Sequence, residues 1–206
     1  FLFAYLFALV RFFIVAAALD TGSAFEGMGA SREVWFSTLA EPALLLGLAA
    51  LGRSAGSLSL SGLLTAGAAD PAAAVPVMVL VAAALVVVLL AENARIPVDD
   101  PNTHLELTMI HEVMVLDHSG PDFAFILYGA ALKLWVLGSL LIHVVAPVRT
   151  GHAGLDIAAA LCAMAGLGVL VGIIESCMAR LRLVRVPRLL MGAVVLSALA
   201  FVLLLR

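Results

Sequence analysis

The residues best suited to chemistry gather in one polar stretch, 91–122, which lies between two long apolar runs. Histidine titrates near neutral pH, and crowded carboxylates raise one another's pKa. The composition of this stretch therefore predicts a cluster that holds and moves protons. It contains three histidines and the arginine Arg95, together with seven carboxylates: Glu92, Asp99, Asp100, Glu106, Glu112, Asp117 and Asp122.

A metal site is the competing interpretation of these residues, and the spacing does not favour it. A metalloprotease needs His-Glu-x-x-His, whereas His111-Glu112 is followed by Val115 where the second histidine would stand. Cys162 and Cys177 form no Cys-x-x-Cys pair and complete no ligand set for zinc, haem or an iron–sulfur cluster. The sequence has no basic patch with interleaved aromatic residues, so nothing in it indicates nucleic-acid binding. We therefore expect no metal, no cofactor and no nucleic acid on this chain.

Charged residues also lie within the apolar runs, where they are costly and indicate function by default. Glu33 and Glu41 are eight residues apart and so return to nearly the same helix face, as two steps of a polar track. Arg11 lies in the middle of the first run. It either pairs with Glu41 for structural reasons or belongs to a relay with it. The depth of Lys133 predicts a partner carboxylate.

The elements that position these residues are membrane helices. The chain has 206 residues, of which 64% are hydrophobic and 12% charged, and its mean hydropathy is +1.18. A soluble domain carries about a quarter charged residues. Long, continuous apolar runs select helices over a barrel, so we expect an all-α polytopic bundle that forms one integral membrane domain, 1–206. Six runs of spanning length are predicted, at about 2–19, 34–51, 72–90, 123–145, 155–174 and 187–205.

Local signals refine this picture. Ser31 is suited to cap the second span, and the Gly- and Ser-rich segment 53–70 indicates a loop without chemistry. A cap signal at 102–103 predicts a helix that runs to about Leu116 and carries His104, Thr108 and His111 on one face. On the fifth span, Gly168-x-x-x-Gly172 predicts a face for close packing with a neighbouring helix.

The distribution of arginine predicts the topology. Arginines are more numerous in the loops 20–33, 92–122 and 175–186 than in the intervening ones, so these three loops should face the cytoplasm of a prokaryotic inner membrane. The stretch MARLRLVRVPRLL, 178–190, is basic and amphipathic. It either anchors the chain at anionic lipid head groups or docks an acidic soluble partner. The chain begins within an apolar run and shows no signal peptide, so we expect further residues before it.

The motif AENARIPVD at 91–99 resembles the signature of the membrane protein that lies beside the quinone chamber in respiratory complex I, the NADH-quinone oxidoreductase. Its register is displaced by one residue around Ala94, and Val98 replaces a phenylalanine. The continuation DPNTHLELTMIHE at 100–112 is more similar to the homologous component of group 4 membrane-bound nickel–iron hydrogenases, the formate hydrogenlyase subunit 4 and hydrogenase-4 component C branch. So are two further stretches, FEGMGASRE at 25–33 and ARLRLVRVP at 179–187.

This resemblance implies a subunit of about eight spans that holds no redox centre. It would anchor hydrogenase large and small subunits and iron–sulfur proteins on the cytoplasmic side, and connect them to antiporter-like membrane subunits. Iron–sulfur clusters and the nickel–iron site would then lie in those partners. The residues expected to couple proton or sodium movement are Glu33, Glu41, Glu92, Asp99, Asp100, Glu106, His111, Glu112 and Lys133, with Arg11, Arg32 and Arg95 as their charge partners.

Two alternatives stay open. The first is the quinone-site subunit of a complex I-like NADH or ferredoxin dehydrogenase, in which a quinone would bind near Glu92. The second is a purely structural membrane anchor, in which the buried charges serve folding alone.

Overall fold

The computed structural model describes residues 2–65, 71–99, 109–147 and 151–205. The all-α prediction is confirmed, since every regular element in these ranges is helical and six helices are long and apolar enough to cross a membrane. The helices are α1 (Leu2–Asp20), α2 (Ala24–Ala55), α3 (Leu60–Thr65), α4 (Pro71–Glu92), α5 (Gly120–Val145), α6 (Ala153–Cys177) and α7 (Val186–Leu203), with 3-10 turns η1 (Glu112–Val115) and η2 (Leu183–Arg185).

The centre of the bundle is the packing of α2, α4 and α7 against one another. Small residues permit the close approach, because a Cβ added at Gly47 of α2 would meet Ser197 of α7 at 3.5 Å and Val81 of α4 at 3.6 Å. The buried Ser197 hydroxyl donates a hydrogen bond to the carbonyl oxygen of Ala43 at 2.8 Å. Without this bond the buried hydroxyl would lose its hydrogen bonds to water and gain none in return, which would cost free energy.

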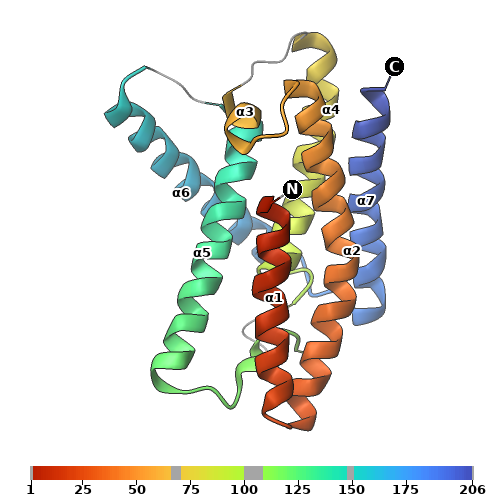
Figure 1. Cartoon of the computed structure of the whole chain (residues 1–206), viewed down its shortest axis with the longest axis vertical. Coiled ribbons are helices and arrows are strands. Elements are labelled where there is room, and N and C mark those ends of the chain that lie inside the picture. Colours follow the sequence, from red (N-terminus) through yellow and green to blue (C-terminus); the bar gives the residue numbers. More distant parts are fainter. Residues whose placement is uncertain (1, 66–70, 100–108, 148–150, 206) are drawn as a thin grey trace.

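The other long helices are added outside this centre (Figure 1): α1 packs on α2, α5 on α4, and α6 on α5. At the α5–α6 contact, a Cβ added at Gly138 would lie 2.8 Å from Leu167. The close-packing face predicted at Gly168 and Gly172 is wrong for this chain, because nothing lies within 4 Å of a Cβ built at either position. The two glycines lie on the open side of α6, which leans away from the bundle in Figure 1.

The connections between spans alternate between the two ends of the bundle. In Figure 1 the α1–α2 turn, the start of α5 and the start of α7 lie toward the lower end, while the end of α2 and the end of α7 lie toward the upper end. The described parts of the three loops predicted to share one side of the membrane therefore do lie toward one end.

Several predicted boundaries need correction. The second helix begins at Ala24 rather than near residue 34, so Ser31 does not cap it. Ser31 lies inside the helix and donates its hydroxyl to the carbonyl oxygen of Met28 at 2.8 Å. The early start has a packing reason, since η1 lies directly against this first part of α2. Segment 53–70, expected to be a loop throughout, contains the short helix α3.

The central loop also departs from the prediction. Residues 100–108 lie outside the described ranges, and after them only the turn η1 is helical, so the predicted continuous helix to Leu116 is wrong in its described part. The reason is Asp99, whose Oδ2 accepts the backbone N–H of Ile110 at 2.9 Å and of His111 at 3.3 Å. The carboxylate thus accepts two N–H groups that backbone carbonyls would accept in the predicted helix.

Candidate functional site

The buried guanidinium of Arg11 is the centre of the candidate site. Its Nη1 donates a hydrogen bond to Glu41, its Nη2 donates one to Glu92, and its Nε lies 3.6 Å from Glu33 Oε1. The prediction that Glu33 and Glu41 share a face of one helix is confirmed, since both reach the same cation. Glu92 comes from the last residue of α4, so Arg11 joins α1, α2 and α4 through charge-assisted bonds.

Lys133 extends this group to a fourth helix. Its Nζ lies 3.6 Å from Glu92 Oε2, which confirms the predicted partner carboxylate. The Glu92 and Lys133 side chains are only 6% and 15% exposed. We call Arg11, Glu33, Glu41, Glu92 and Lys133 the charge cluster. Three carboxylates face two cations within it, so its net charge is −1 when all five groups are ionised and zero once one proton is bound.

A cavity of about 350 Å³ lies between α1 and α5 and borders the charge cluster. Its polar lining consists of Glu92, Asn93, His111 and Lys133, and the rest is apolar. Burial lowers the pKa of His111 from 6.5 to about 4, and the nearby Lys133 charge acts in the same direction. The imidazole is therefore neutral near pH 7, and can both donate and accept a hydrogen bond there.

A second cavity of about 560 Å³ adjoins the first on the side of the central loop. The two share Asn93, His111, Ile126 and Ala130 in their linings. The second cavity is more polar, because Arg95, Asp99, Glu112 and His118 also line it. His111 thus stands between a polar space at the loop and the mainly apolar space beside the charge cluster.

Asp99 fixes the loop at this border. Besides the two backbone N–H groups, it binds Arg180, whose Nη2 lies 3.0 Å from Oδ1. The carbonyl oxygen of Pro97 also accepts the N–H of Leu181 at 3.0 Å. The turn after α4 is therefore tied both to the central loop and to the segment before α7.

The roles expected for the other arginines change in the structure. Arg95 was expected to be a charge partner of the coupling carboxylates, but among the described residues its ion-pair partner is Glu175 at 3.6 Å. Arg11 makes the multiple contacts instead, because it projects from a neighbouring helix into the space between α2 and α4. Arg32 donates a hydrogen bond to the carbonyl oxygen of Met109 at 2.8 Å and so supports the central loop.

Two charged residues that fix the central loop, Glu26 and Arg180, were not among the predicted site residues. Glu26 is fully buried and accepts the backbone N–H of Asp117 at 2.9 Å, which fixes the end of the central loop to α2. The spacing of Ser23 and Glu26 matches a capping box, which predicts that Glu26 bonds locally at the start of the helix. In the structure Glu26 bonds instead to the distant Asp117. Arg180 lies in a run of arginines, and only the folded chain distinguishes it from its neighbours.

Of the predicted site residues not yet placed, Glu112 is the one within the described ranges. Glu112 lines the second cavity and begins η1. Asp100, Glu106, His104 and Thr108 lie outside the described ranges.

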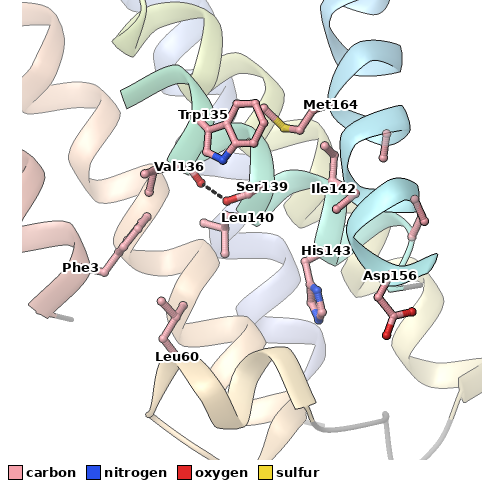
Figure 2. A pocket seen from close by; sticks show the side chains of 14 residues that line it. Phe3, Leu60, Trp135, Val136, Ser139, Leu140, Ile142, His143, Asp156 and Met164 are labelled. Carbon is pink, nitrogen blue, oxygen red and sulfur yellow. Dashed lines mark hydrogen bonds between the residues drawn. The ribbon is translucent and has the colours of Figure 1, made fainter. Parts of the chain in front are cut away.

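A third cavity, of about 310 Å³, lies between α5 and α6, away from the predicted site residues (Figure 2). Trp135, Ser139 and His143 of α5 and Asp156 of α6 line it together with apolar residues. Ser139 uses its hydroxyl for a local bond to the carbonyl oxygen of Val136 at 2.8 Å. None of the described residues expected to couple ions borders this space.

Comparison with known proteins agrees with the arrangement. A family model described as NADH dehydrogenase matches residues 1–206. Formate hydrogenlyase subunit 4 of Escherichia coli (strain K12) is 36% identical over 204 residues, which cover 96% of this chain and 66% of that protein. Hydrogenase-4 component C of the same organism is 36% identical over 146 residues, covering 69% of this chain and 44% of that protein. The chain thus spans just under two thirds of the first relative and under half of the second.

Proposed function

Because the chain belongs to the NADH dehydrogenase family, we propose that it is the non-redox, ion-coupling membrane subunit of a membrane-bound nickel–iron hydrogenase complex. The names of its two relatives, a formate hydrogenlyase subunit and a hydrogenase component, support this branch of the family. Its partners are then hydrogenase large and small subunits, iron–sulfur proteins and antiporter-like membrane subunits. The nickel–iron site and the iron–sulfur clusters belong to those partners, and this chain binds no cofactor.

The proposed placement follows the arginine distribution. The single domain 1–206 lies in a prokaryotic cytoplasmic membrane, with the loops 20–33, 92–122 and 175–186 toward the cytoplasm. The loop 91–122 then couples the soluble arm to the membrane, since it lies beside the second cavity and leads to the charge cluster.

The observation that carries the coupling role is the charge cluster itself. A charge that is not balanced inside a membrane is costly, yet three carboxylates here face two cations. The cluster can relieve this imbalance by taking one proton or by holding one sodium ion. It can also release that cation again, because in the ionised state each carboxylate still has a cationic nitrogen within 3.6 Å.

A route to the cluster is formed by residues that border the two cavities. From the polar cavity beside Asp99 and Glu112, His111 leads to the cavity that Lys133 and Glu92 line. A neutral imidazole can accept a proton at one nitrogen and donate from the other. From Glu92 the contacts continue through Arg11 to the carboxylates of α2.

The test is the Glu41→Gln variant, which keeps the shape of the side chain and removes its charge. We expect the complex to assemble and to evolve hydrogen, but ion uptake coupled to turnover to fall in inverted vesicles. Asp20→Asn is the matched control, since Asp20 is exposed at the end of α1 and does not belong to the charge cluster. Wild-type coupling in Glu41→Gln would sink the proposal, and failure to assemble would favour the purely structural anchor.

The quinone-site alternative is favoured by one observation, the mainly apolar cavity of about 350 Å³ beside Glu92, His111 and Lys133. Metal analysis of the complex that copurifies with the chain in mild detergent separates the two functions. Stoichiometric nickel with iron supports the hydrogenase assembly. Iron and flavin without nickel, together with sensitivity to a quinone-site inhibitor, support a complex I-like dehydrogenase.

A further inference from the structure

The segment between α6 and α7 presents arginines that the charge cluster and the loop contacts do not use. Arg182, Arg185 and Arg188 are exposed, and no described side chain forms an ion pair or hydrogen bond with their guanidinium groups. They differ in this from Arg180, which Asp99 holds. Three positive charges within seven residues form a strongly basic patch on the surface of the chain.

The position of this patch is fixed relative to the membrane. It lies between the end of α6 at Cys177 and the first turn of α7, which begins at Val186, and both helices are long and apolar enough to span a bilayer. The contacts of Arg180 and Leu181 with the turn after α4 hold the segment against the bundle. The guanidinium groups are therefore held at the level where the spans leave the hydrocarbon, which is the level of lipid phosphates.

Exposed apolar side chains accompany the arginines. Val184 is 77% exposed between Arg182 and Arg185. Along α7, one exposed apolar face continues from Arg188 at helical spacing, through Met191, Val195, Leu199 and Val202. A basic head-group site at the end of an apolar helix face matches a phospholipid, which has a phosphate joined to two acyl chains. A water-facing dock for an acidic protein would not need the apolar face.

From this alignment we propose that Arg182, Arg185 and Arg188, with the exposed face of α7 that continues from them, form a binding site for an anionic phospholipid. The guanidinium groups bind the phosphate through charge-assisted hydrogen bonds, and the α7 face packs against the acyl chains. The site lies apart from the cavities that border the charge cluster, and the inference does not depend on the proposed ion coupling.

The experiment is native mass spectrometry of the purified full chain in mild detergent, titrated with phosphatidylglycerol or with phosphatidylcholine of the same acyl chains. The wild-type chain is expected to prefer phosphatidylglycerol. Replacing all three arginines by glutamine should remove the preference, because each lost charge lowers the affinity for phosphatidylglycerol by about fivefold. Replacing them by lysine should retain most of it. Arg53→Gln is the control, because Arg53 lies at the end of α2 and donates to the carbonyl oxygen of Leu204.

Two further measurements make the outcome decisive. Val195→Asn should weaken the binding of both lipids alike, since it changes only the face that packs against the acyl chains. Equal wild-type affinity for the two lipids, or a preference that survives the triple glutamine variant, overturns the proposal. If the triple variant instead releases soluble partner subunits from the complex while phosphatidylglycerol binding is unchanged, the patch docks an acidic protein and the lipid site is wrong.

Discussion

Glu92 is shared between two cations from two different helices. Its Oε1 accepts a hydrogen bond from Arg11 of α1, and its Oε2 lies 3.6 Å from Lys133 Nζ of α5. The residue also ends α4 and so begins the turn that leads to Asp99. Glu92 is thus the point where the contacts of the charge cluster, the first cavity and the central loop meet.

Removing the Lys133 charge tests this shared position. In Lys133→Met the ionised cluster has one cation against three carboxylates, so it retains a proton that the wild-type cluster releases. We expect ion-coupled turnover to fall by about a hundredfold, the scale of a lost proton-transfer group. Lys133→Arg keeps the charge and should recover most of the activity. Equal loss in both variants, measured by hydrogen evolution and ion uptake in vesicles, would show that shape rather than charge matters.

Arg11 is predicted to dominate the stability of the bundle. Arg11→Leu leaves three carboxylates without their common cation, and breaking a buried ion pair in this way costs about 3–5 kcal/mol. Unfolding in detergent, followed by circular dichroism, measures the difference from wild type. Arg53→Leu, at a more exposed position, should change stability by less than about 1 kcal/mol. A small effect of Arg11→Leu would mean that solvent reaches the cluster and screens it.

The central loop should open as the pH falls, because of His111. The pKa of His111 is about 4 in the folded chain, against an ordinary 6.5. Between these values the opened loop binds a proton that the closed loop does not, so stability is lost as the pH falls from about 6.5 to about 4 and changes little below. Amide hydrogen exchange over 109–116 reports this opening. His111→Gln should remove the pH dependence, and an unchanged dependence would assign it to another group.

Asp99 and Arg180 are predicted to act as one unit in holding the loop. Asp99→Asn removes the ion pair and weakens the two backbone contacts at Ile110 and His111, while Arg180→Gln removes the ion pair and leaves these two backbone contacts in place. Both variants should speed hydrogen exchange at these two amides, and the first should do so more. In a double-mutant cycle the effects should be less than additive. Full additivity would show that the pair contributes no coupling energy.

Gly29 is predicted to set the distance between α2 and η1. A Cβ at this position would lie 2.9 Å from the carbonyl oxygen of Ile110 and would collide with the Val113 side chain. Gly29→Val should therefore displace η1, enlarge the second cavity and raise hydrogen exchange over 109–116. Gly27→Val is the matched control on the same turn, since nothing lies within 4 Å of a Cβ there. Similar effects of both variants would indicate lost helix propensity rather than a collision.

The sequence predicts the helices and some charge relationships, because both follow from local patterns. Apolar length identifies the six spans, and the spacing of eight residues places Glu33 and Glu41 on one face. The depth of Lys133 predicts a carboxylate partner, but its identity as Glu92 depends on how α4 packs against α5. Hydrophobic periodicity does not specify such packing.

The role of Arg180 and the open glycines of α6 likewise could not be predicted from local sequence patterns. Arg180 is separated from Asp99 by 81 residues, and the run of arginines around it predicts only a basic surface. Gly168 and Gly172 have the spacing of a packing motif, yet the neighbour that α6 contacts in this chain meets a different face. Both outcomes are set by tertiary contacts that one sequence does not specify.

The buried arginine of α1 also has a consequence for the insertion of the chain into the membrane during its synthesis. An arginine at the centre of an isolated span disfavours insertion by about 2.5–3.5 kcal/mol. The three acidic partners of Arg11 are synthesised after it, the last of them 81 residues later. In the lipid, α1 is therefore stabilised in two steps, first when α2 supplies Glu33 and Glu41 and then when the end of α4 supplies Glu92. A nascent chain that stops before Glu92 lacks one of the three carboxylates that surround Arg11, so the polar contacts of α1 are complete only once α4 has been inserted.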